Sequence, residues 1–393
     1  MRIGVASFRF KHYSTARSIV GIVPEAEYLP LQDLFSWVNR SAQVLNRLAG
    51  RNLITTFNLN NQFNDLGLNQ VDLVHLFNAI SYTRKPWITS FETLVPRFRG
   101  ALRPEELDSK GVDKVHRGLE ALASKACQRL IALSTCSAGF ERALLARFPG
   151  YQPEIEKKLV ILHPGQAQQL TRYDDKPSSS SGRLRLMFAG SAFFRKGGRE
   201  IVDTLLKLRH ELGDCLELVL ISSFKIEDYA TRETPLDVQR YQALVHENMD
   251  WIEYYPLLSN VEVLALMKSS QVGLLPTHAD SYGYSMLEFQ ASGCPVISTD
   301  VRALPEINNE RVGWLIPVPK NDLGEARYGS VEERQKLSQA ISHGLETALR
   351  SILAGPGSIR VKGELALERI RQEHNPADRA EKLRNWYTEV LNS

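Results

Sequence analysis

Residues 280–298 read DSYGYSMLEFQASGCPVIS, and in this stretch seven residues separate two carboxylates, Asp280 and Glu288. Short apolar runs lie before it at 272–276 and at its end at 295–298, whereas helix formers fill the part between them. We therefore predict a strand, a helix and a second, parallel strand. In such a unit the helix N-terminus points unpaired N–H groups and a partial positive charge at the carboxyl ends of the strands. A diphosphate fits such an edge, and both carboxylates could accept hydrogen bonds from a polyhydroxyl ligand.

The whole chain has the composition of an ordinary globular protein, with 393 residues of which 43% are hydrophobic and 24% charged. This length predicts two domains. No apolar run reaches the roughly 18 residues that a membrane span needs, and charge interrupts the N-terminus before a signal-peptide core could form. We therefore expect a cytoplasmic protein.

The cysteines give no sign of a metal or disulfide site. Cys127, Cys136, Cys215 and Cys294 are scattered without a two-residue spacing, which fits neither a disulfide framework nor zinc. We expect four buried thiols. The sequence also lacks an Asp-x-Asp pair and a histidine cluster of metal-ligand spacing, so we predict no metal site.

Positive charge is concentrated in the first part of the chain. The net charge of +3 is too small to indicate nucleic-acid binding, but residues 1–165 carry 21 Lys and Arg against 14 Asp and Glu. Arg97, Arg99 and Arg103 cluster in one predicted loop. Two interpretations stay open: contact with an anionic acceptor or acidic lipid headgroups, or a solvated basic surface, which is the commoner case.

A linker divides the chain. Residues 166–182 have few side chains to bury and end in a proline, four serines and a glycine. Apolar, strand-like runs recur on both sides, separated by stretches of helical periodicity. These runs lie at 2–7, 52–57, 72–77, 86–91, 129–134 and 159–162, and then at 184–189, 216–222, 249–254, 272–275 and 295–298. The alternation predicts an α/β protein with two parallel, doubly wound sheets.

With these features, the chain resembles the retaining GT-B glycosyltransferases of the family-4 type, the glycosyl transferases group 1, over nearly its whole length. The most specific part is the acidic pair followed by a Gly-x-Pro-Val-Ile strand, to which Asp280, Gly283, Glu288 and residues 293–297 correspond. The resemblance implies that Glu288 binds the ribose of the donor and that Asp280 lies against the donor sugar. The family usually has Glu where this chain has Asp280, so the side chain is one methylene shorter. We expect Tyr284 and Ser285 to bind the donor beside them.

The resemblance also implies an architecture. Two Rossmann-like domains would face a central cleft, with residues 1–165 binding the acceptor and residues 183–375 binding the nucleotide sugar. Apolar residues at three- and four-residue steps after Pro376 predict an amphipathic helix in the final segment, 376–393. This helix is expected to cross back and pack on the N-terminal domain.

A second motif lies at 188–198, FAGSAFFRKGG, where a predicted strand runs into a glycine-rich loop and a helix. In the family, an Arg and a Lys at this place bind the donor diphosphate. Lys196 matches the Lys after Gly190, but Ser191 stands at the usual Arg position, and we expect Arg195 to supply the missing charge. A Lys and several backbone N–H groups would stabilise the leaving nucleoside diphosphate.

A third candidate is Glu92, which follows a predicted strand in the front domain where many family members have His. A carboxylate there could orient the acceptor hydroxyl or take its proton; a surface or helix-terminal acid is an equally good interpretation. His75 lies in an apolar strand, and a hydrogen-bonded core histidine is the commoner outcome for such a position. The loop at 7–12 holds basic residues where the family usually has glycines, so it could contact an acceptor or simply have another shape.

Together these features imply transfer of a sugar from a nucleoside diphosphate sugar, with UDP or GDP expected, to an acceptor hydroxyl with retention at the anomeric carbon. No metal and no cofactor would be needed. The acceptor would be a glycan, a glycolipid or a small molecule in polysaccharide or glycolipid synthesis, with no nucleic-acid partner. The enzyme would work in the cytoplasm, with a peripheral contact at the inner face of the membrane through its N-terminal domain. The sugar, the acceptor and the oligomeric state stay open.

Two alternatives keep the fold and change the activity. One is a GT-B epimerase or phosphorylase. The other is a sugar-nucleotide or glycan-binding protein without catalysis, which the departures at Ser191 and Asp280 would suit. A dehydrogenase is disfavoured because no Gly-x-Gly-x-x-Gly follows any predicted strand.

Overall fold

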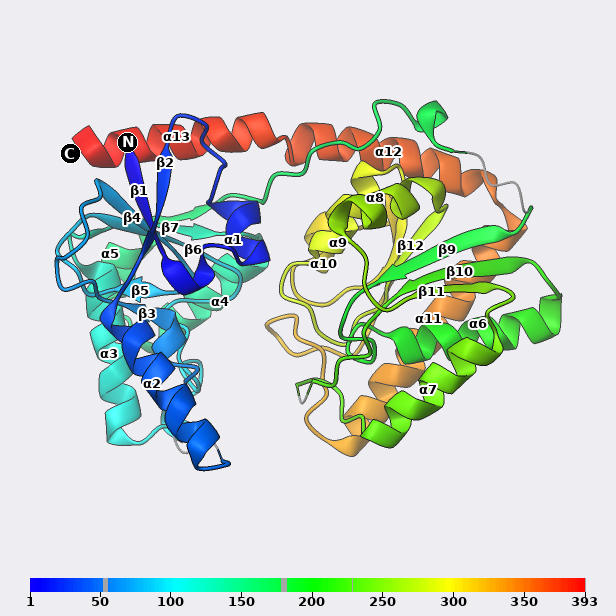
Figure 1. Cartoon of the computed structure of the whole chain (residues 1–393), viewed down its shortest axis with the longest axis horizontal. Helices are drawn as coiled ribbons and strands as arrows, with labels where there is room; N and C mark the ends of the chain where they lie inside the picture. Colours follow the sequence, from blue (N-terminus) through cyan, green and yellow to red (C-terminus); the bar gives the residue numbers. More distant parts are fainter. Residues whose placement is uncertain (52–55, 178–181, 228, 393) are drawn as a thin grey trace. The chain divides into compact units, whose positions relative to one another are not determined.

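The computed structural model describes residues 1–51, 56–177, 182–227 and 229–392. The chain forms two compact units, one of residues 1–165 with 374–393 and one of residues 166–373 (Figure 1). We call them unit 1 and unit 2. Each unit contains a six-stranded sheet in which all neighbouring strands are parallel. The predicted α/β class with two Rossmann-like domains is therefore confirmed.

Unit 1 has the strand order β2-β1-β4-β6-β7-β8. The strands are β1 (Arg2–Ala6), β2 (Glu27–Leu31), β4 (Leu73–Phe77), β6 (Trp87–Phe91), β7 (Cys127–Ala132) and β8 (Leu159–Ile161). A second, two-stranded sheet pairs β3 (Gln62–Phe63) with β5 (Ile80–Ser81). The α-helices are α1 (Tyr13–Ser18), α2 (Leu34–Leu48), α3 (Ser109–Ala123), α4 (Thr135–Arg147), α5 (Gln152–Glu156) and α13 (Pro376–Asn392). Short 3-10 turns lie at Ser7–Arg9, Leu59–Asn61 and Pro104–Glu106.

The final helix, α13, packs into the core of unit 1. Leu383, Tyr387 and Val390 join a buried cluster with residues of β1, β4, β6 and β7. Arg379 is only 2% exposed, and its guanidinium donates to the carbonyls of Leu162, at 2.9 Å, and Ser18, at 2.9 Å. Polar anchors of this kind fix the register of a helix, because a slipped helix would leave a buried charge without acceptors.

Unit 2 has the strand order β11-β10-β9-β12-β13-β14. In chain order this is 3-2-1-4-5-6, the doubly wound arrangement of dinucleotide-binding folds. The strands are β9 (Leu184–Ala189), β10 (Leu216–Ile221), β11 (Ile252–Tyr255), β12 (Val272–Leu275), β13 (Val296–Thr299) and β14 (Gly313–Ile316). The helices are α6 (Gly198–Leu212), α7 (Pro235–Glu247), α8 (Asn260–Ser269), α9 (Tyr284–Ala291), α10 (Leu304–Ile307), α11 (Val331–Ala354) and α12 (Gly357–Glu373), with a 3-10 turn at Tyr173–Asp175.

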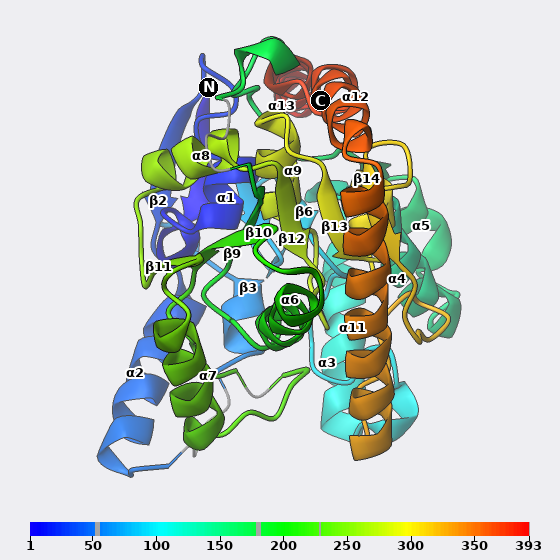
Figure 2. The same cartoon turned by 90° about the vertical axis from the view of Figure 1, so that its right-hand side faces the viewer.

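Helices cover both faces of the unit 2 sheet. Figure 1 shows α8, α9 and α12 on one face and α6, α7 and α11 on the other, and Figure 2 shows α6 beside α11. Because both faces are covered, the inner strands read as continuous apolar runs, and all four residues of β12 and of β13 are buried. Among the described residues, no helix is long and apolar enough to cross a membrane.

The predicted strands match the structure except at edges and in one segment. β2, β14 and the two-residue strands β3 and β5 were not predicted: β2 carries Pro30 and has one buried residue among five, and β3 and β5 are too short to give a pattern. Exposure explains the weak apolar signal of β2, whereas β14 was missed although three of its four residues are buried. The run predicted at 52–57 falls largely on residues 52–55, outside the described residues. The end of the predicted linker, 178–181, lies outside them too.

The four cysteines are free, but the prediction that all are buried is wrong for two of them. Cys127 and Cys294 are buried, whereas Cys136 and Cys215 are partly exposed. Burial raises the pKa of Cys294 to about 11, so this thiol stays protonated and unreactive near neutral pH.

Candidate functional site

The strand order of unit 2 changes direction at β9 and β12, and in open α/β sheets ligands bind at the carboxyl ends of such strands. The sheet grows from β9 toward β10 on one side and toward β12 on the other, so the loops after these two strands diverge. The loop after β9 leads into α6, and the loop after β12 leads into α9. These are the two predicted motifs, and the fold brings them to the same edge of the sheet.

Glycines shape the loop after β9. The stem of Lys196 runs across Gly190, where an added Cβ would lie 2.5 Å from Lys196 Cδ. Gly197 has a φ of +84°, and its Cβ would overlap the carbonyl oxygen of Pro276 at the end of β12. A left-handed backbone in contact with a neighbouring carbonyl admits only glycine. The two loops are thus locked together at backbone level.

Lys196 and Asp280 lie together at this edge. Lys196 Nζ is 3.7 Å from Asp280 Oδ2, and the two side chains are 19% and 14% exposed. Asp280 is held in turn by its own loop, because Oδ1 accepts from the backbone N–H groups of Tyr282, at 3.2 Å, and Gly283, at 3.0 Å. A carboxylate fixed in this way cannot swing away, and it keeps the ammonium group in place.

The N-terminus of α9 opens beside Asp280. Gly283 begins the helix with a φ of +85°, and Tyr284 and Ser285 form its first turn. Among the described residues, Ser285 Oγ is a buried oxygen without a hydrogen-bond partner. Glu288 lies in the second turn and is only 7% exposed. The ion pair of Lys196 and Asp280 thus lies beside a helix N-terminus that carries a hydroxyl and a second carboxylate, which suits a ligand with both phosphate and hydroxyl groups.

Arg195 has a different environment from Lys196. Its Nε donates to Glu227 Oε2 at 2.5 Å, and its terminal nitrogen donates to the carbonyl of Ala279 at 2.5 Å. Burial by itself raises the pKa of Glu227, but the hydrogen bond and charge of Arg195 outweigh burial and lower it. Arg195 therefore ties the loop after β9 to two neighbouring segments. Ser191 is exposed, and its carbonyl accepts from the N–H of Lys225 at 2.9 Å.

Glu92 lies at the carboxyl edge of the unit 1 sheet, directly after β6. Its N–H donates to Asn78 Oδ1 at 2.9 Å, and Asn78 follows β4 with a φ of +54°. Arg9, after β1, is close enough that the Glu92 carboxylate favours its charged form. Burial, with the charge of Arg97, nevertheless lowers the pKa of Arg9 to about 10. Three strand ends thus bring an acid, an amide and a cation together.

His75 is a core residue. It is fully buried in β4, with Nδ1 2.7 Å from the Tyr387 hydroxyl of α13 and Nε2 2.9 Å from Ser90 Oγ. Burial, with the charge of Arg379, lowers the pKa of His75 to about 3, so the ring is neutral at physiological pH. Both nitrogens are used within the core, and a catalytic role for His75 is thereby contradicted.

Sequence reasoning did not identify Glu227 or Asn78, and it did not predict that Arg9 lies near Glu92. Glu227 follows β10 in a segment without a recognisable pattern, and only the fold brings it to Arg195. Asn78 and Arg9 could have been found from their positions after strands of unit 1. Many other loop residues also follow strands, so this position alone does not single them out. Within the described residues, no group of three or more His, Cys, Asp or Glu side chains is arranged to hold a metal.

Comparison with known proteins shows that part of unit 2 matches a known protein family. Residues 183–327 match the family model described as Glycosyl transferases group 1. This segment contains Gly190, Lys196, Asp280 and Glu288, so it spans every unit 2 residue that we placed at the edge of the sheet. The predicted resemblance to the glycosyl transferases group 1 is therefore confirmed for residues 183–327.

Curated relatives are distant. The chain is 22% identical over 259 residues to glycogen synthase from Mycobacterium tuberculosis, covering 65% of this chain and 54% of that protein. It is 25% identical over 249 residues to D-inositol 3-phosphate glycosyltransferase from Pseudarthrobacter chlorophenolicus, covering 63% of this chain and 53% of that protein. The chain thus spans about half the length of these curated relatives.

Solved structures share the fold over the whole chain. Anabaena HepE in complex with UDP and glucose superimposes with a TM-score of 0.57 at 13% identity, covering 99% of this chain and 100% of that one. Sucrose-phosphate synthase from Thermosynechococcus elongatus gives a TM-score of 0.56 at 16% identity, covering 93% of this chain and 81% of that one. At this level of identity the similarity defines the fold, which is the predicted GT-B class.

Proposed function

We propose that this chain is a glycosyltransferase that moves a sugar from a nucleoside diphosphate sugar to an acceptor hydroxyl. The observation that carries the proposal is the position of Lys196 and Asp280 beside the N-terminus of α9, within the segment that matches the glycosyl transferases group 1. The proposal includes retention at the anomeric carbon and independence from metal ions. UDP-sugars are the first donors to test, because HepE, which shares the fold, was solved with UDP and glucose.

The roles follow from the charges. As the bond from the anomeric carbon to the diphosphate breaks, negative charge grows on the leaving oxygen. Lys196 Nζ and the amides of the first turn of α9 would stabilise that charge without any reorganisation. Asp280 holds Lys196 in place and can accept hydrogen bonds from sugar hydroxyls, while Glu288 would accept them from the ribose. The proposed metal independence assigns stabilisation of the diphosphate to these donors and to no divalent ion.

The test is a transfer assay with UDP-, GDP- and ADP-sugars and a panel of glycan, glycolipid and small-molecule acceptors. NMR of the product gives the anomeric configuration, and EDTA tests the metal independence. Lys196→Ala should lower kcat more than donor affinity, since the charge that it meets is largest in the transition state. Lys207→Ala is the matched control, because Lys207 forms only an exposed ion pair with Glu346. Inversion, or full activity in Lys196→Ala, would contradict the proposal.

A second function is favoured by one observation. Ser191 stands where the family has Arg, and Arg195 is engaged with Glu227 and Ala279, so the donor diphosphate would meet fewer free cations than is usual. This favours a protein that binds sugar nucleotides without turning them over. Saturation-transfer NMR separates the two: binding of a UDP-sugar, with neither transfer to any acceptor nor hydrolysis, would support the non-catalytic function.

We further propose that unit 1 makes a peripheral contact with an anionic membrane at the cytoplasmic face, and that the acceptor belongs to polysaccharide or glycolipid synthesis. The support is helix α2. Its buried face holds Ser36, Asn39 and Ala42, whereas five of its large apolar residues face solvent. Those residues are Trp37, Val38, Val44, Leu45 and Leu48, between 44% and 79% exposed. Exposed Arg40 and Arg47 lie on the same helix. An apolar stripe with basic flanks suits a helix lying in a membrane interface.

Vesicle co-sedimentation tests this contact. The protein should bind vesicles that contain phosphatidylserine and not pure phosphatidylcholine, and Leu48→Glu should release it, because a charge at the most exposed residue of the stripe opposes insertion. Leu257→Glu in unit 2, at an 82% exposed leucine, is the matched control. Equal sedimentation of the two variants would remove α2 from the contact.

A further inference from the structure

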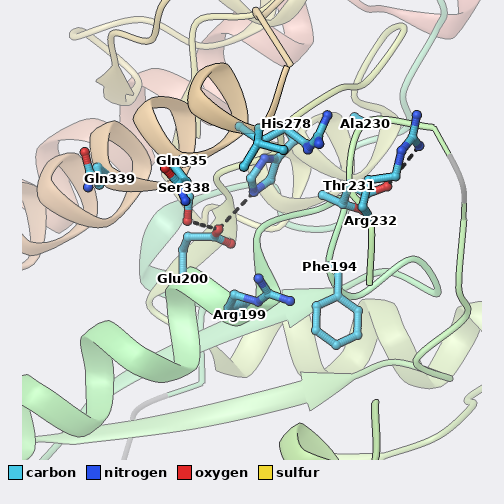
Figure 3. A pocket seen from close by; sticks show the side chains of 12 residues that line it. Phe194, Arg199, Glu200, Ala230, Thr231, Arg232, His278, Gln335, Ser338 and Gln339 are labelled. Atoms are coloured by element: carbon cyan, nitrogen blue, oxygen red, sulfur yellow. Dashed lines mark hydrogen bonds and ion pairs between the residues drawn. The ribbon is translucent and has the colours of Figure 1, made fainter. Parts of the chain in front are cut away.

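Unit 2 contains a cavity of about 620 Å³ that is lined by none of the donor-site residues. Its walls come from the first turn of α6, the first turns of α11, the segment 230–232 after β10, and His278 in the loop after β12 (Figure 3). His278 and Asp280 leave the same loop, but His278 joins Glu200 of α6 while Asp280 joins Lys196. The cavity is therefore a neighbour of the donor site with a separate set of side chains.

The floor of the cavity holds buried polar atoms that the protein does not satisfy. Glu200 is 3% exposed and His278 is 4% exposed. Glu200 Oε1 accepts from Ser338 Oγ at 2.6 Å and lies 3.0 Å from His278 Nε2. Among the described residues, Glu200 Oε2, His278 Nδ1 and Thr231 Oγ1 have no hydrogen-bond partner. Buried polar atoms nearly always have partners, so three orphans around one cavity indicate a polar ligand.

Burial by itself would raise the pKa of Glu200, but the charge and hydrogen bond of His278, together with the Ser338 hydroxyl, outweigh burial and lower it. The carboxylate is therefore ionised near neutral pH. Its free oxygen Oε2 is an acceptor only, which suits a ligand hydroxyl and excludes a second anion at that point.

The rim of the cavity is basic. Arg199, Arg232 and Arg334 line it. Contacts with the protein orient Arg334 and Arg199, and Arg199 Nη2 also lies 3.7 Å from Asp237 Oδ1. Arg334 donates to the carbonyls of Tyr328, at 2.9 Å, and Gly329, at 3.3 Å. The guanidinium of Arg199 lies 5.1 Å from the centre of the Phe194 ring. Guanidinium groups held in this way present their remaining N–H groups in a fork that matches phosphate.

A brace holds the segment 230–232 against the loop before α11. Arg302 donates to the Tyr229 hydroxyl at 2.8 Å and to Glu325 Oε1 from Nε at 3.1 Å. The rings of Tyr229 and Tyr328 meet with their centres 5.8 Å apart. These contacts fix the wall that carries Thr231 and Arg232, so the cavity is formed before any ligand arrives. A preformed site loses less entropy on binding.

We propose that this cavity is a second binding site, distinct from the donor site, for a polyol that carries a phosphate group. Arg232 and Arg334 hold the phosphate. Glu200 Oε2, His278 Nδ1 and Thr231 Oγ1 hold the hydroxyls, and the Phe194 ring offers an apolar face to the sugar ring. The volume lies in the range of small-ligand pockets. Such a ligand would hydrogen-bond all three unpaired atoms and also contact the arginines of the rim. An inorganic anion would bind the arginines and leave the three buried atoms without partners.

Isothermal titration of the full chain at saturating UDP tests the site with four probes. These are glucose 6-phosphate, glycerophosphoinositol, inorganic phosphate and glucose. We expect saturable binding of the first two at least tenfold tighter than of phosphate or glucose. Glucose 6-phosphate represents a free sugar phosphate and glycerophosphoinositol a lipid headgroup, so the tighter of the two identifies the source. Absence of saturable binding of both overturns the proposal.

Variants assign the binding to the cavity. Arg334→Gln should weaken glucose 6-phosphate and phosphate by about tenfold, while Thr231→Val, nearly equal in shape, should weaken glucose 6-phosphate and leave phosphate unchanged. Arg311→Gln, at an exposed arginine outside the cavity, is the control for charge. Equal affinities of Arg334→Gln and Arg311→Gln would overturn the assignment.

A final variant separates this inference from the donor site. Lys196→Ala removes the ammonium group of the donor site, and it should leave glucose 6-phosphate affinity unchanged even where UDP binding is weakened. Loss of glucose 6-phosphate binding in Lys196→Ala would place that ligand in the donor site and overturn the second site. Loss of UDP binding alone leaves the second site intact and bears only on the proposed function.

Discussion

The carboxyl edges of the two sheets differ in how their side chains are held. In unit 2, two loops that follow neighbouring strands supply a lysine, a carboxylate and a helix N-terminus, and glycines lock the loops together. In unit 1, Glu92 and Arg9 follow two different strands; Asn78, after a third strand, accepts from the Glu92 N–H, while Arg9 donates to Asn60 and Asn61. The first edge is rigid at backbone level, and the second is joined through side chains.

This difference suits two tasks. A nucleoside diphosphate is the same chemical group in every donor, so a rigid cradle of backbone amides and one lysine can serve it. Acceptors vary, and a site made of side chains from separate loops can change one residue without disturbing the sheet. The comparison predicts that damage to the unit 2 edge is structural and severe, whereas damage to the unit 1 edge is local.

The largest effect is expected from Gly197→Ala. The added Cβ meets the carbonyl of Pro276 while the backbone keeps a φ of +84°, so unit 2 should lose on the order of 3 kcal/mol of unfolding free energy. Gly324→Ala is the control: its φ is +74°, and the nearest atoms lie 3.8 Å away. Chemical denaturation followed by circular dichroism measures both. Equal losses would mean that backbone strain alone, and not the locking of the loops, explains the glycine.

The next effect separates the two edges by function. Glu288→Gln should weaken donor binding about tenfold to a hundredfold, because hydrogen bonds to a charged group contribute about 1.5–3 kcal/mol. Glu92→Gln should leave donor affinity unchanged and lower kcat/KM for the acceptor. Titration with a UDP-sugar measures the donor affinity of both variants, and steady-state kinetics measure kcat/KM for the acceptor. A donor defect in Glu92→Gln would break the division of tasks between the edges.

A smaller effect concerns pH and unit 1. The pKa of His75 is lowered to about 3 in the folded chain, while an unfolded histidine titrates near 6.5. Below about pH 6.5 the unfolded chain therefore binds a proton that the folded chain refuses, and stability falls as the pH falls. His75→Gln should remove this loss, so its stability relative to the unaltered protein should rise by up to about 1.4 kcal/mol per pH unit below 6.5.

Glu141 supplies the check on that prediction. Burial raises the pKa of Glu141 to about 8. Between about pH 4.5 and 8 the folded chain therefore holds a proton that the unfolded chain has released, and stability falls as the pH rises through this range. The two groups oppose each other between about pH 4.5 and 6.5. Glu141→Gln should therefore reveal the His75 slope by itself. Parallel stability curves for the unaltered protein and His75→Gln would show that His75 is protonated in the core.

The smallest effect is expected at Arg195. If Arg195 mainly ties loops together through Glu227, then Arg195→Gln should reduce donor affinity less than tenfold and should raise the pKa of Glu227 toward its usual value. Glu227→Gln should reproduce the effect on affinity, because it breaks the same pair. A much larger loss in Arg195→Gln alone would mean that Arg195 contacts the diphosphate and that the unit 2 edge carries two cations.

The inner strands and the edge of unit 2 were predictable because their determinants are local. Residues 272–298 hold a strand, a helix and a strand with Gly283 and the acidic pair at fixed spacing, and burial on both faces makes each strand a continuous apolar run. β2 was missed because it is largely exposed and carries a proline, which leaves a weak apolar pattern. The partner of Arg195 was missed because Glu227 is 32 residues away in sequence and follows a different strand.

The sequence by itself determined the α/β class, the two doubly wound sheets and the motif of the proposed donor site, since each depends on periodicity or spacing within about thirty residues. Only the tertiary structure decided that His75 is a neutral core residue against Tyr387, that Arg195 pairs with Glu227, and that Glu200, His278 and Thr231 leave unpaired atoms around one cavity. The physical reason is that burial and long-range pairing set the protonation state of a polar side chain and decide which of its hydrogen-bonding atoms stay unpaired. Neither can be read from the residues next to it in sequence.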